Sequence, residues 1–254
     1  MPHRPRHSGF SLLELIISIG VISLLLLMLL PTLSRARDIG CRAVCANNLR
    51  QMNVGWQGYV QDNKDFFPQA RSLPDWHYGG VEFTSGTREP VLAGARPINR
   101  YLTNDVRGRA DAIAGLFRCP SDAGIFERGA AVRGRPGRSV LADSATCFET
   151  YGNSYRANPM ILDSTAAGID SHHRPLALHE VHVDTSRLLV TGDPAWYYAA
   201  LAPGSGLEAS WHTSPDSGHM LAVDGSIRFI DFAMRDASEF TLRPRPGTPG
   251  GERR

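Results

Sequence analysis

The stretch Gly9-Phe10-Ser11-Leu12-Leu13-Glu14 opens an apolar run that continues almost without interruption to Leu30 and stops before Pro31. A helix rises about 1.5 Å per residue, so about twenty residues cross a hydrocarbon core about 30 Å thick. Residues 10–30 are therefore predicted to form a transmembrane helix. A secretory signal peptide would have an apolar region of about 7–15 residues followed by a small-residue cleavage site, and the sequence after Leu30 has no such site.

Glu14 is an ionisable residue inside this apolar run. Insertion of such a side chain into a bilayer costs about 2.5–3.5 kcal/mol, so it is expected to have a partner. If the chain is cut between Gly9 and Phe10, the new α-amine lies one helical turn from Glu14, and the amine of a neighbouring subunit could neutralise the carboxylate. The alternative is a carboxylate near the interface that reaches water and favours the positive end of the helix dipole.

The same stretch resembles the processing and methylation motif of type IV prepilins and type II secretion pseudopilins. The resemblance implies cleavage after Gly9, N-methylation of Phe10, and Glu14 as the acidic fifth residue of the mature chain. Pro31 would then stand at mature position 22, where many type IV pilins have a helix-perturbing proline. The implied partners are the prepilin peptidase and methyltransferase, other pilin-like subunits, an assembly platform with its ATPase, and membrane lipid.

Charge gives a mixed signal about orientation, because Arg35, Arg37 and Arg42 after the span compete with Arg4 and Arg6 before it. The motif decides for a single-pass protein of the cytoplasmic (inner) membrane with a cytoplasmic N-terminus. The predicted organisation is a leader (1–9), the transmembrane helix (10–30), the soluble half of the same helix (31–62), an exported head (63–241) and a disordered tail (242–254).

The helix is expected to resume after Pro31, because apolar residues recur there at spacings of three and four and would form one stripe. The stripe consists of Cys41, Cys45, Leu49, Met52, Trp56 and Tyr59. Gly55 and Gly58 are expected to weaken the last turns, and Asp62-Asn63-Lys64-Asp65 with Pro68 reads as a stop. Asp62, Asn63 and Asp65 are also faint candidates for calcium ligands, since some pseudopilins hold calcium in a head-domain loop.

The fold class predicted is α+β, with the long helix packed on an antiparallel sheet. A short helix is expected over 100–114, and strands over 148–155, 176–183 and 187–190. A hairpin of 220–223 and 226–232 should turn at Asp224-Gly225 in type I′ geometry. The aromatic segment 72–94, with Trp76, Tyr78 and Phe83, would pack on the sheet or contact another subunit.

The spacing of the cysteines and histidines in the head gives little support for a metal or redox site. The four cysteines include no C-x-x-C pair, which argues against a zinc ribbon or a thioredoxin-like site, and an exported domain allows disulfides in three complete pairings. His179 and His182 lie three apart and would point to opposite faces of a strand, which argues against a metal site built on that pair. The wider set of possible ligands is His172, His173, His179, His182, His212, His219, Asp184, Asp193 and Asp224.

His212 followed by Asp224-Gly225 resembles the C-terminal H-x9-D-G pattern of a large pseudopilin-like family. That family also has phrases similar to Phe117-Arg118-Cys119-Pro120-Ser121-Asp122 and Asn153-Ser154-Tyr155. Here eleven residues, not nine, separate His212 from Asp224, and an insertion around Pro215-Asp216 would account for the difference.

No phosphate-binding loop or G-x-S-x-G sequence occurs, and no basic stretch is interleaved with aromatics as in nucleic-acid binding. The sequence therefore predicts a structural subunit of a pilus-like or pseudopilus filament, with no enzymatic activity and no cofactor beyond a possible structural calcium. The alternatives are a membrane-anchored surface binding module and an anchored metal-dependent hydrolase that uses the histidines.

Overall fold

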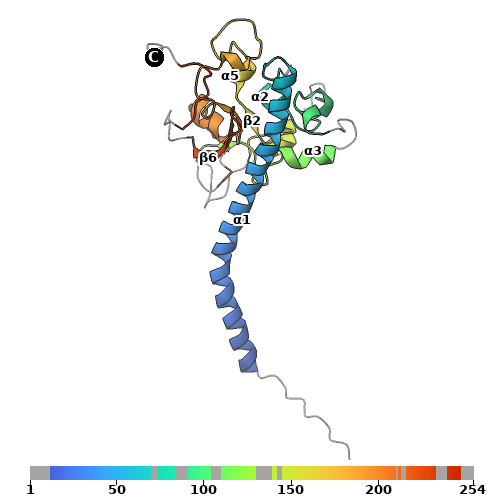
Figure 1. Cartoon of the computed structure of the whole chain (residues 1–254). Coiled ribbons are helices and arrows are strands. Elements are labelled where there is room, and N and C mark those ends of the chain that lie inside the picture. The colour runs from blue at the N-terminus through green and yellow to red at the C-terminus, as the bar shows by residue number, and fades with distance from the viewer. Residues whose placement is uncertain are drawn as a thin grey trace, which may run out of the picture. The chain divides into compact units, whose positions relative to one another are not determined.

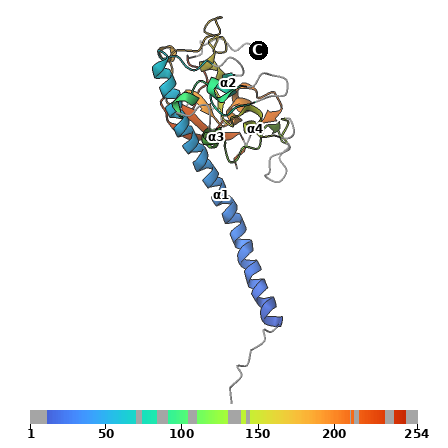
Figure 2. The same ribbon diagram turned by 90° about the vertical axis from the view of Figure 1, so that its right-hand side faces the viewer.

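The computed structural model describes residues 12–69, 74–83, 91–103, 110–129, 139–141, 145–209, 211–212, 216–232 and 239–246. The chain divides into two compact units, Met1–Gly40 and Cys41–Arg254, which are described separately. Figures 1 and 2 give two views of the helices and strands. The α+β class is confirmed, since a long N-terminal helix precedes a region of antiparallel sheet.

Helix α1 (Leu12–Asp62) is the long helix predicted from the apolar run and the stripe that follows it. It continues through Pro31, although proline has no N–H to donate to the carbonyl four residues earlier. The hydroxyl of Thr32 donates to the Leu29 carbonyl oxygen at 2.7 Å, which supplies a hydrogen bond beside the proline. Within the first unit α1 is long and apolar enough to cross a membrane, judged by its length and composition.

In the second unit, the predicted stripe of α1 forms part of the core. Cys45, Leu49, Met52 and Trp56 are buried, whereas the two end members of the stripe are only partly covered. The glycines have a different role from the predicted one: a Cβ atom at Gly55 would lie 3.0 Å from the Leu102 side chain, and one at Gly58 would lie 2.8 Å from the Tyr101 ring. Both glycines therefore let the segment around the 3-10 turn η2 (Asn99–Tyr101) approach the helix closely.

The main sheet has four antiparallel strands in the order β2-β3-β5-β6, and β1 pairs with β4 in a separate two-stranded sheet. The strands are β1 (Phe126–Glu127), β2 (Arg156–Ala157), β3 (Leu189–Gly192), β4 (Leu207–Glu208), β5 (Ser217–Ala222) and β6 (Ile227–Asp231). The shorter helices are α2 (Pro74–His77), η1 (Ala93–Ala95), η2 (Asn99–Tyr101), α3 (Ala110–Phe117), α4 (Cys147–Tyr151), α5 (Pro159–Leu162), η4 (Leu178–Glu180) and the π-helical η5 (Tyr197–Leu201).

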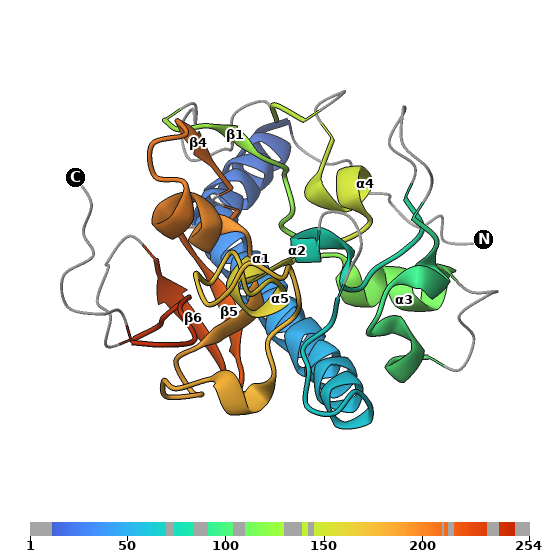
Figure 3. The same ribbon diagram turned by 90° about the horizontal axis from the view of Figure 1, so that it is seen from above.

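Alternate residues of a strand point to opposite faces of the sheet, and here an apolar cluster covers each face. Leu221 of β5 belongs to the apolar cluster that contains the buried residues of α1 and α3. Its neighbour Met220 belongs to a second cluster with Trp196 and Phe240. Figure 3 shows β5 and β6 on one side of α1 and α3 on the other, so this part of α1 lies between the sheet and the helical layer.

The predicted hairpin is confirmed as β5 and β6, with Leu221 opposite Ile227. Its turn differs from the predicted type I′, which needs a positive φ at both central residues. In the structure only Gly225 of the pair has a positive φ, 87°, and its N–H donates to the Ala222 carbonyl oxygen at 3.0 Å. The pattern is that of a longer loop in which glycine supplies the left-handed residue.

Four other predicted elements need correction. Residues 148–155 begin as helix α4, because Thr146 and Glu149 form a capping box and Gly152 ends the helix with a φ of 71°. The strand expected over 176–183 contains the 3-10 helix η4, and the one expected over 187–190 lies two residues later, as β3. The helix expected over 100–114 is α3, which begins at Ala110, after the separate turn η2.

The aromatic segment packs into the head. Trp76 and Tyr78 are buried, and the Trp76 ring stacks on Tyr151 with centroids 4.3 Å apart. Residues 72–73 and 84–90 of this segment lie outside the described residues.

Residues 242–246 of the predicted tail pack against the head, because Leu242 is buried and the Pro244 carbonyl oxygen accepts from the N–H of His182 at 2.7 Å. Residues 247–254 lie outside the described residues. The backbone of this segment docks because it runs beside β3, where Leu189 N–H donates to Thr241 at 3.0 Å.

Candidate functional site

The N-terminal site lies in the first unit. Glu14 is in the first turn of α1, where the N-terminal end of the helix dipole favours a carboxylate. The Ser18 hydroxyl donates to the Glu14 carbonyl oxygen at 2.7 Å. Gly9 and Phe10, the predicted processing residues, lie outside the described residues. The large apolar side chains from Leu12 to Leu33 are 53–75% exposed, so the chain itself leaves this surface to be covered by lipid or by other molecules.

A second site lies in the head, where four segments bring together two thiols, a carboxylate and an imidazole. Cys45 comes from α1, Cys119 follows α3, Asp193 follows β3, and His212 lies between β4 and β5. All four side chains are buried, and one ligand atom from each lies within 4.8 Å of the others. The Sγ atoms of Cys45 and Cys119 are 2.6 Å apart. We name this group the buried Cys–Asp–His cluster.

Asp193 is the centre of the hydrogen bonding in the cluster. Its Oδ2 contacts His212 Nε2 at 3.2 Å and His219 Nδ1 at 3.1 Å, and accepts from the His219 backbone N–H at 2.7 Å. Among the described residues, its Oδ1 and His212 Nδ1 make no hydrogen bond, although both atoms are buried. A Cβ atom at Gly218 would lie 2.7 Å from the Cβ of Asp193, so a glycine there lets β5 approach the carboxylate.

The environment of the cluster favours the charged forms of Asp193, His212 and Cys45, but the neutral thiol of Cys119. Burial alone would raise the pKa of Asp193, but the hydrogen bonds with His212 and His219 outweigh it and hold that pKa below its usual range. Burial lowers the pKa of His212, whereas the contacts with Asp193 and Cys45 raise it to about 10. The Cys119 thiol lowers the pKa of Cys45 to about 6, and burial raises the pKa of Cys119 well above its usual value.

Hydrogen bonds within and between segments 117–122 and 153–155 hold Cys119 in place. Its backbone N–H donates to Ser154 Oγ at 3.0 Å, and Ser154 Oγ donates to Asp122 Oδ2 at 2.6 Å. The Asp122 carboxylate also accepts from the N–H groups of Cys147 and Phe148 at the start of α4, while burial raises its pKa. These bonds fix the loop of Cys119 against α4 and β2.

Tyr155 and Asn48 connect the same loop to α1. Asn48 Nδ2 contacts the Arg118 carbonyl oxygen at 3.1 Å and the Tyr155 hydroxyl at 3.1 Å. Asn48 is one helical turn from Cys45, so a polar contact between α1 and the Cys119 loop lies beside the two thiols.

Comparison with known families matches residues 4–30 to the prokaryotic N-terminal methylation motif. The match supports a type IV pilin-like precursor. The prepilin-type motif implies processing by a prepilin peptidase and assembly with other pilin subunits, and with the apolar helix it is consistent with a single-pass inner-membrane anchor. Comparisons with curated proteins and with solved structures gave no match.

The residues of the predicted H-x9-D-G-like motif have separate contacts. His212 contacts Asp193, whereas Asp224 is exposed at the hairpin turn and accepts from the Ser226 N–H at 2.8 Å. A Cβ atom at Gly225 would lie 2.6 Å from Asn53 Nδ2 on α1, so the Asp224-Gly225 turn lies against this helix. The Gln57 side chain on α1 also donates to the Val223 carbonyl oxygen, at 3.1 Å.

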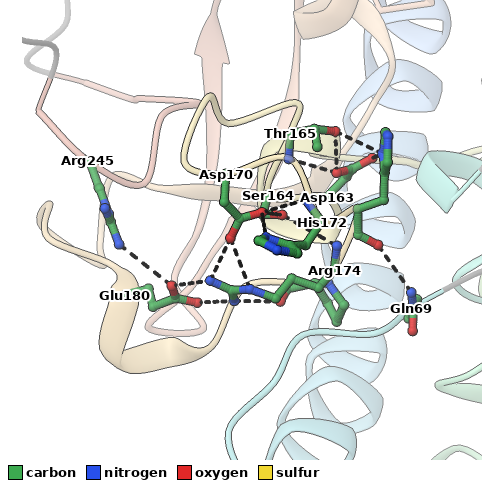
Figure 4. A network of polar contacts seen from close by, with 11 residues as sticks. Gln69, Asp163, Ser164, Thr165, Asp170, His172, Arg174, Glu180 and Arg245 are labelled. Carbon is green, nitrogen blue, oxygen red and sulfur yellow. Dashed lines mark hydrogen bonds and ion pairs between the residues drawn. The ribbon is translucent and has the colours of Figure 1, made fainter.

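The histidines at 172 and 173 belong to a surface network of the loop 163–180 (Figure 4). Each pairs with an aspartate, His172 with Asp170 and His173 with Asp163. Arg174 and Glu180 form a bidentate pair with both N–O distances at 2.7 Å, and Figure 4 shows Arg245 reaching the same glutamate. A further member, Gln69, joins the network to the segment after α1. We interpret this network as a structural one that holds the loop 163–180 and Arg245 in place. Its carboxylates already pair with cations or with hydrogen-bond donors.

The faint calcium candidates lie where the predicted helix stop is found. Asp62 Oδ2 accepts from the Tyr101 hydroxyl at 3.0 Å, and Asn63 Nδ2 donates to the Tyr59 carbonyl oxygen at 2.7 Å. Asp65 has a positive φ of 64°, as the end of a helix often requires. Calcium binding at these residues stays a prediction.

Sequence reasoning missed the buried Cys–Asp–His cluster. It considered His212, His219 and Asp193 as possible ligands and examined the cysteines separately, because no local spacing connects the two sets. The available signal was the presence of Cys119 and His212 in phrases of the resembled family, but their meeting point is visible only in the folded chain.

Proposed function

We propose that this chain is the precursor of a structural subunit of a type IV pilus-like or type II secretion pseudopilus filament. A prepilin peptidase would cut between Gly9 and Phe10, and the new N-terminus would be methylated. The mature subunit would remain anchored in the inner membrane, with its head exported, until assembly. The assembly platform and its ATPase would then transfer the subunit into the filament.

One observation carries this proposal: an apolar helix with a prepilin-type motif at its start leaves its large side chains 53–75% exposed. Apolar surface in contact with water costs about 25 cal/mol per Å², so this length of helix needs an apolar environment at every stage. Lipid supplies it before assembly, and the packed helices of neighbouring subunits would supply it in a filament.

Glu14 gives this packing a register. A carboxylate in an apolar bundle is costly when it is unpaired, and the mature α-amine of a neighbouring subunit would remove that cost. The leader blocks the pairing, because the amine of Phe10 exists only after the Gly9–Phe10 bond is cut. Processing would therefore precede assembly.

The first experiment is intact-mass analysis and N-terminal sequencing of the protein isolated from its native membrane. We expect a chain that begins at N-methylated Phe10, and accumulation of the full precursor when Gly9→Trp replaces the wild type. A native chain that retains its first nine residues would refute the processing step.

The second experiment compares Glu14→Ala and Glu14→Gln with wild type in the filament fraction sheared from cells. Both variants should be cleaved and should remain in the membrane, with little subunit in the sheared fraction. Exposed Asp231 on the head provides a matched control, because Asp231→Asn also removes one carboxylate but leaves the helix unchanged. Normal incorporation of both Glu14 variants would contradict the assigned role.

The binding-module alternative is less well supported, because two of the three aromatic side chains of its segment, Trp76 and Tyr78, are buried, and Phe83 is partly buried. The hydrolase alternative is also weakened. The histidines that gather around Asp193 do so in a buried group with four protein ligand atoms, whereas a catalytic metal keeps a position open for water or substrate.

A further inference from the structure

We propose that Cys45, Cys119, Asp193 and His212 bind one structural Zn²⁺ ion in the head, an inference that stands apart from the filament role. The ligands would be the two thiolate sulfur atoms, one carboxylate oxygen and one imidazole nitrogen. Such a site would fasten α1 to the sheet and to the loop that follows α3.

The donor set suits zinc. Zn²⁺ in structural sites takes four ligands in a tetrahedron, with bonds of about 2.3 Å to sulfur and about 2.0–2.2 Å to nitrogen and oxygen. Those bond lengths place the ligand atoms about 3.3–3.8 Å apart. In the structure the four atoms lie within 4.8 Å of one another, and the His212 to Asp193 contact is 3.2 Å. Movements of about 1 Å, chiefly a separation of the two sulfur atoms, would complete the tetrahedron. Thiolate ligands favour zinc over magnesium or calcium.

A buried carboxylate oxygen indicates where a cation would bind. Asp193 Oδ1 makes no hydrogen bond within the described part of the chain, whereas Asp193 Oδ2 has three donors around it. A buried polar atom without a partner is costly, and a bound cation would remove that cost for the carboxylate oxygen. The His219 contacts to Oδ2 would orient the carboxylate, as outer hydrogen bonds do around protein metal ligands.

A disulfide between Cys45 and Cys119 is the rival interpretation, since both thiols are adjacent and an exported domain meets oxidising conditions. A disulfide is neutral and uses only the two sulfur atoms. It gives no reason for an aspartate and a histidine to be buried beside them, at the cost of desolvating a carboxylate. The zinc site uses all four groups.

The site would join segments that are far apart in sequence. Cys45 lies on the helix that continues into the apolar anchor, and the other three ligands belong to the rest of the head. Bound zinc would add stability to the fold and would resist separation of α1 from the sheet.

The experiment uses the full-length chain, purified in detergent under reducing conditions. Elemental analysis should find one zinc per chain. After removal of zinc with a chelator, Co²⁺ should restore binding and give the intense absorption of tetrahedral cobalt with thiolate-to-cobalt charge transfer. A Cys45→Ser variant should lose both signals. Cys147→Ser is the matched control, because Cys147 is also a buried cysteine but lies outside the cluster. The Cys147→Ser protein should bind zinc and cobalt like wild type. His219→Gln should weaken zinc affinity about 10–100-fold, the range typical of a lost outer-shell partner.

Thiol labelling of the wild type keeps the test decisive if Cys45→Ser does not fold. Zinc should protect Cys45 and Cys119 from alkylation, and the chelator should expose both, as located by peptide mapping. The proposal would be overturned by absence of cobalt binding to the reduced wild type, by equal zinc content in Cys45→Ser and Cys147→Ser, or by a native peptide map in which Cys45 and Cys119 are joined. None of these results bears on cleavage after Gly9, so failure here and failure of the filament proposal are distinguishable.

Discussion

Replacement of Gly225 by alanine should separate the hairpin turn from α1. Gly225 has a φ of 87°, and a Cβ atom there would lie 2.6 Å from Asn53 Nδ2. A left-handed alanine costs about 1–2 kcal/mol, and restriction of the unfolded chain returns about 0.4–1 kcal/mol, which leaves about 1 kcal/mol. Asn53 Nδ2 is the end of a half-buried side chain that can move aside, and leaving its rotamer adds about 0.5–1.5 kcal/mol. We therefore expect Gly225→Ala to lower the free energy of unfolding by about 1.5–2.5 kcal/mol.

Gly206→Ala provides the control, because Gly206 has a similar φ of 71° and its Cβ would meet no atom within 4 Å among the described residues. Its expected cost is the backbone part, about 1 kcal/mol. The assay is urea unfolding of the full-length chain in detergent, followed by tryptophan fluorescence, to which buried Trp56 on α1 contributes. With a denaturant slope of about 2 kcal/mol per M, Gly225→Ala should unfold at about 0.25–0.75 M less urea than the control.

Asn53→Ala completes the design, because it removes the atom that the new methyl group would meet. In that background the cost of Gly225→Ala should fall to that of Gly206→Ala, since coupling between two variants reports their contact. Equal midpoints for Gly225→Ala and Gly206→Ala, or a cost at Gly225 that Asn53→Ala leaves unchanged, would refute the docking of this turn on α1.

Three further outcomes are expected. Leu49→Ala should lower the free energy of unfolding by about 2–5 kcal/mol because Leu49 is fully buried, and Val54→Ala on the exposed side of the same helix should change it by less than about 0.5 kcal/mol; similar urea midpoints would contradict the packing of α1. Thr146→Ala should cost about 1 kcal/mol through loss of the α4 cap, and an unchanged urea midpoint would count against it. Pairing with Arg174 lowers the pKa of Glu180 to about 2, below an unfolded value of about 4.3, so the pair stabilises the folded state at pH values above about 4.3. Wild type should therefore be more stable than Glu180→Gln by about 1 kcal/mol at neutral pH, and acid-unfolding measurements should show this difference vanish between about pH 4.3 and 2. A difference that persists at pH 2 would argue against the pair.

Local sequence patterns in the head predicted some secondary-structure elements correctly and others wrongly. The Asp224-Gly225 pair predicted the hairpin correctly, because turn chemistry acts over a few residues. The aromatic residues after Cys147 suggested a strand, but the capping box of Thr146 with Glu149, together with Gly152, makes a helix there. These capping residues stand in the sequence at the required spacing, so that error came from weighting side-chain type above caps.

The tail and the two glycines of α1 show a different kind of limit. Nothing near Leu242 in sequence indicates that a proline-rich segment would dock beside β3, since the partner strand lies about fifty residues earlier. Gly55 and Gly58 weaken a helix when it is considered alone, yet in the head they admit Leu102 and Tyr101. Their value depends on a neighbour that the local pattern does not contain.

The sequence by itself indicated a membrane-length apolar helix with a pilin-like N-terminal motif, because apolar length, one carboxylate and a glycine before the run are properties of contiguous residues. Only the tertiary structure decided the buried Cys–Asp–His cluster. Its members come from positions 45, 119, 193 and 212, and a helix, the end of a strand and two loops must pack before their side chains meet. Periodicity describes neighbours along the chain, whereas a binding site of this kind is made by neighbours in space.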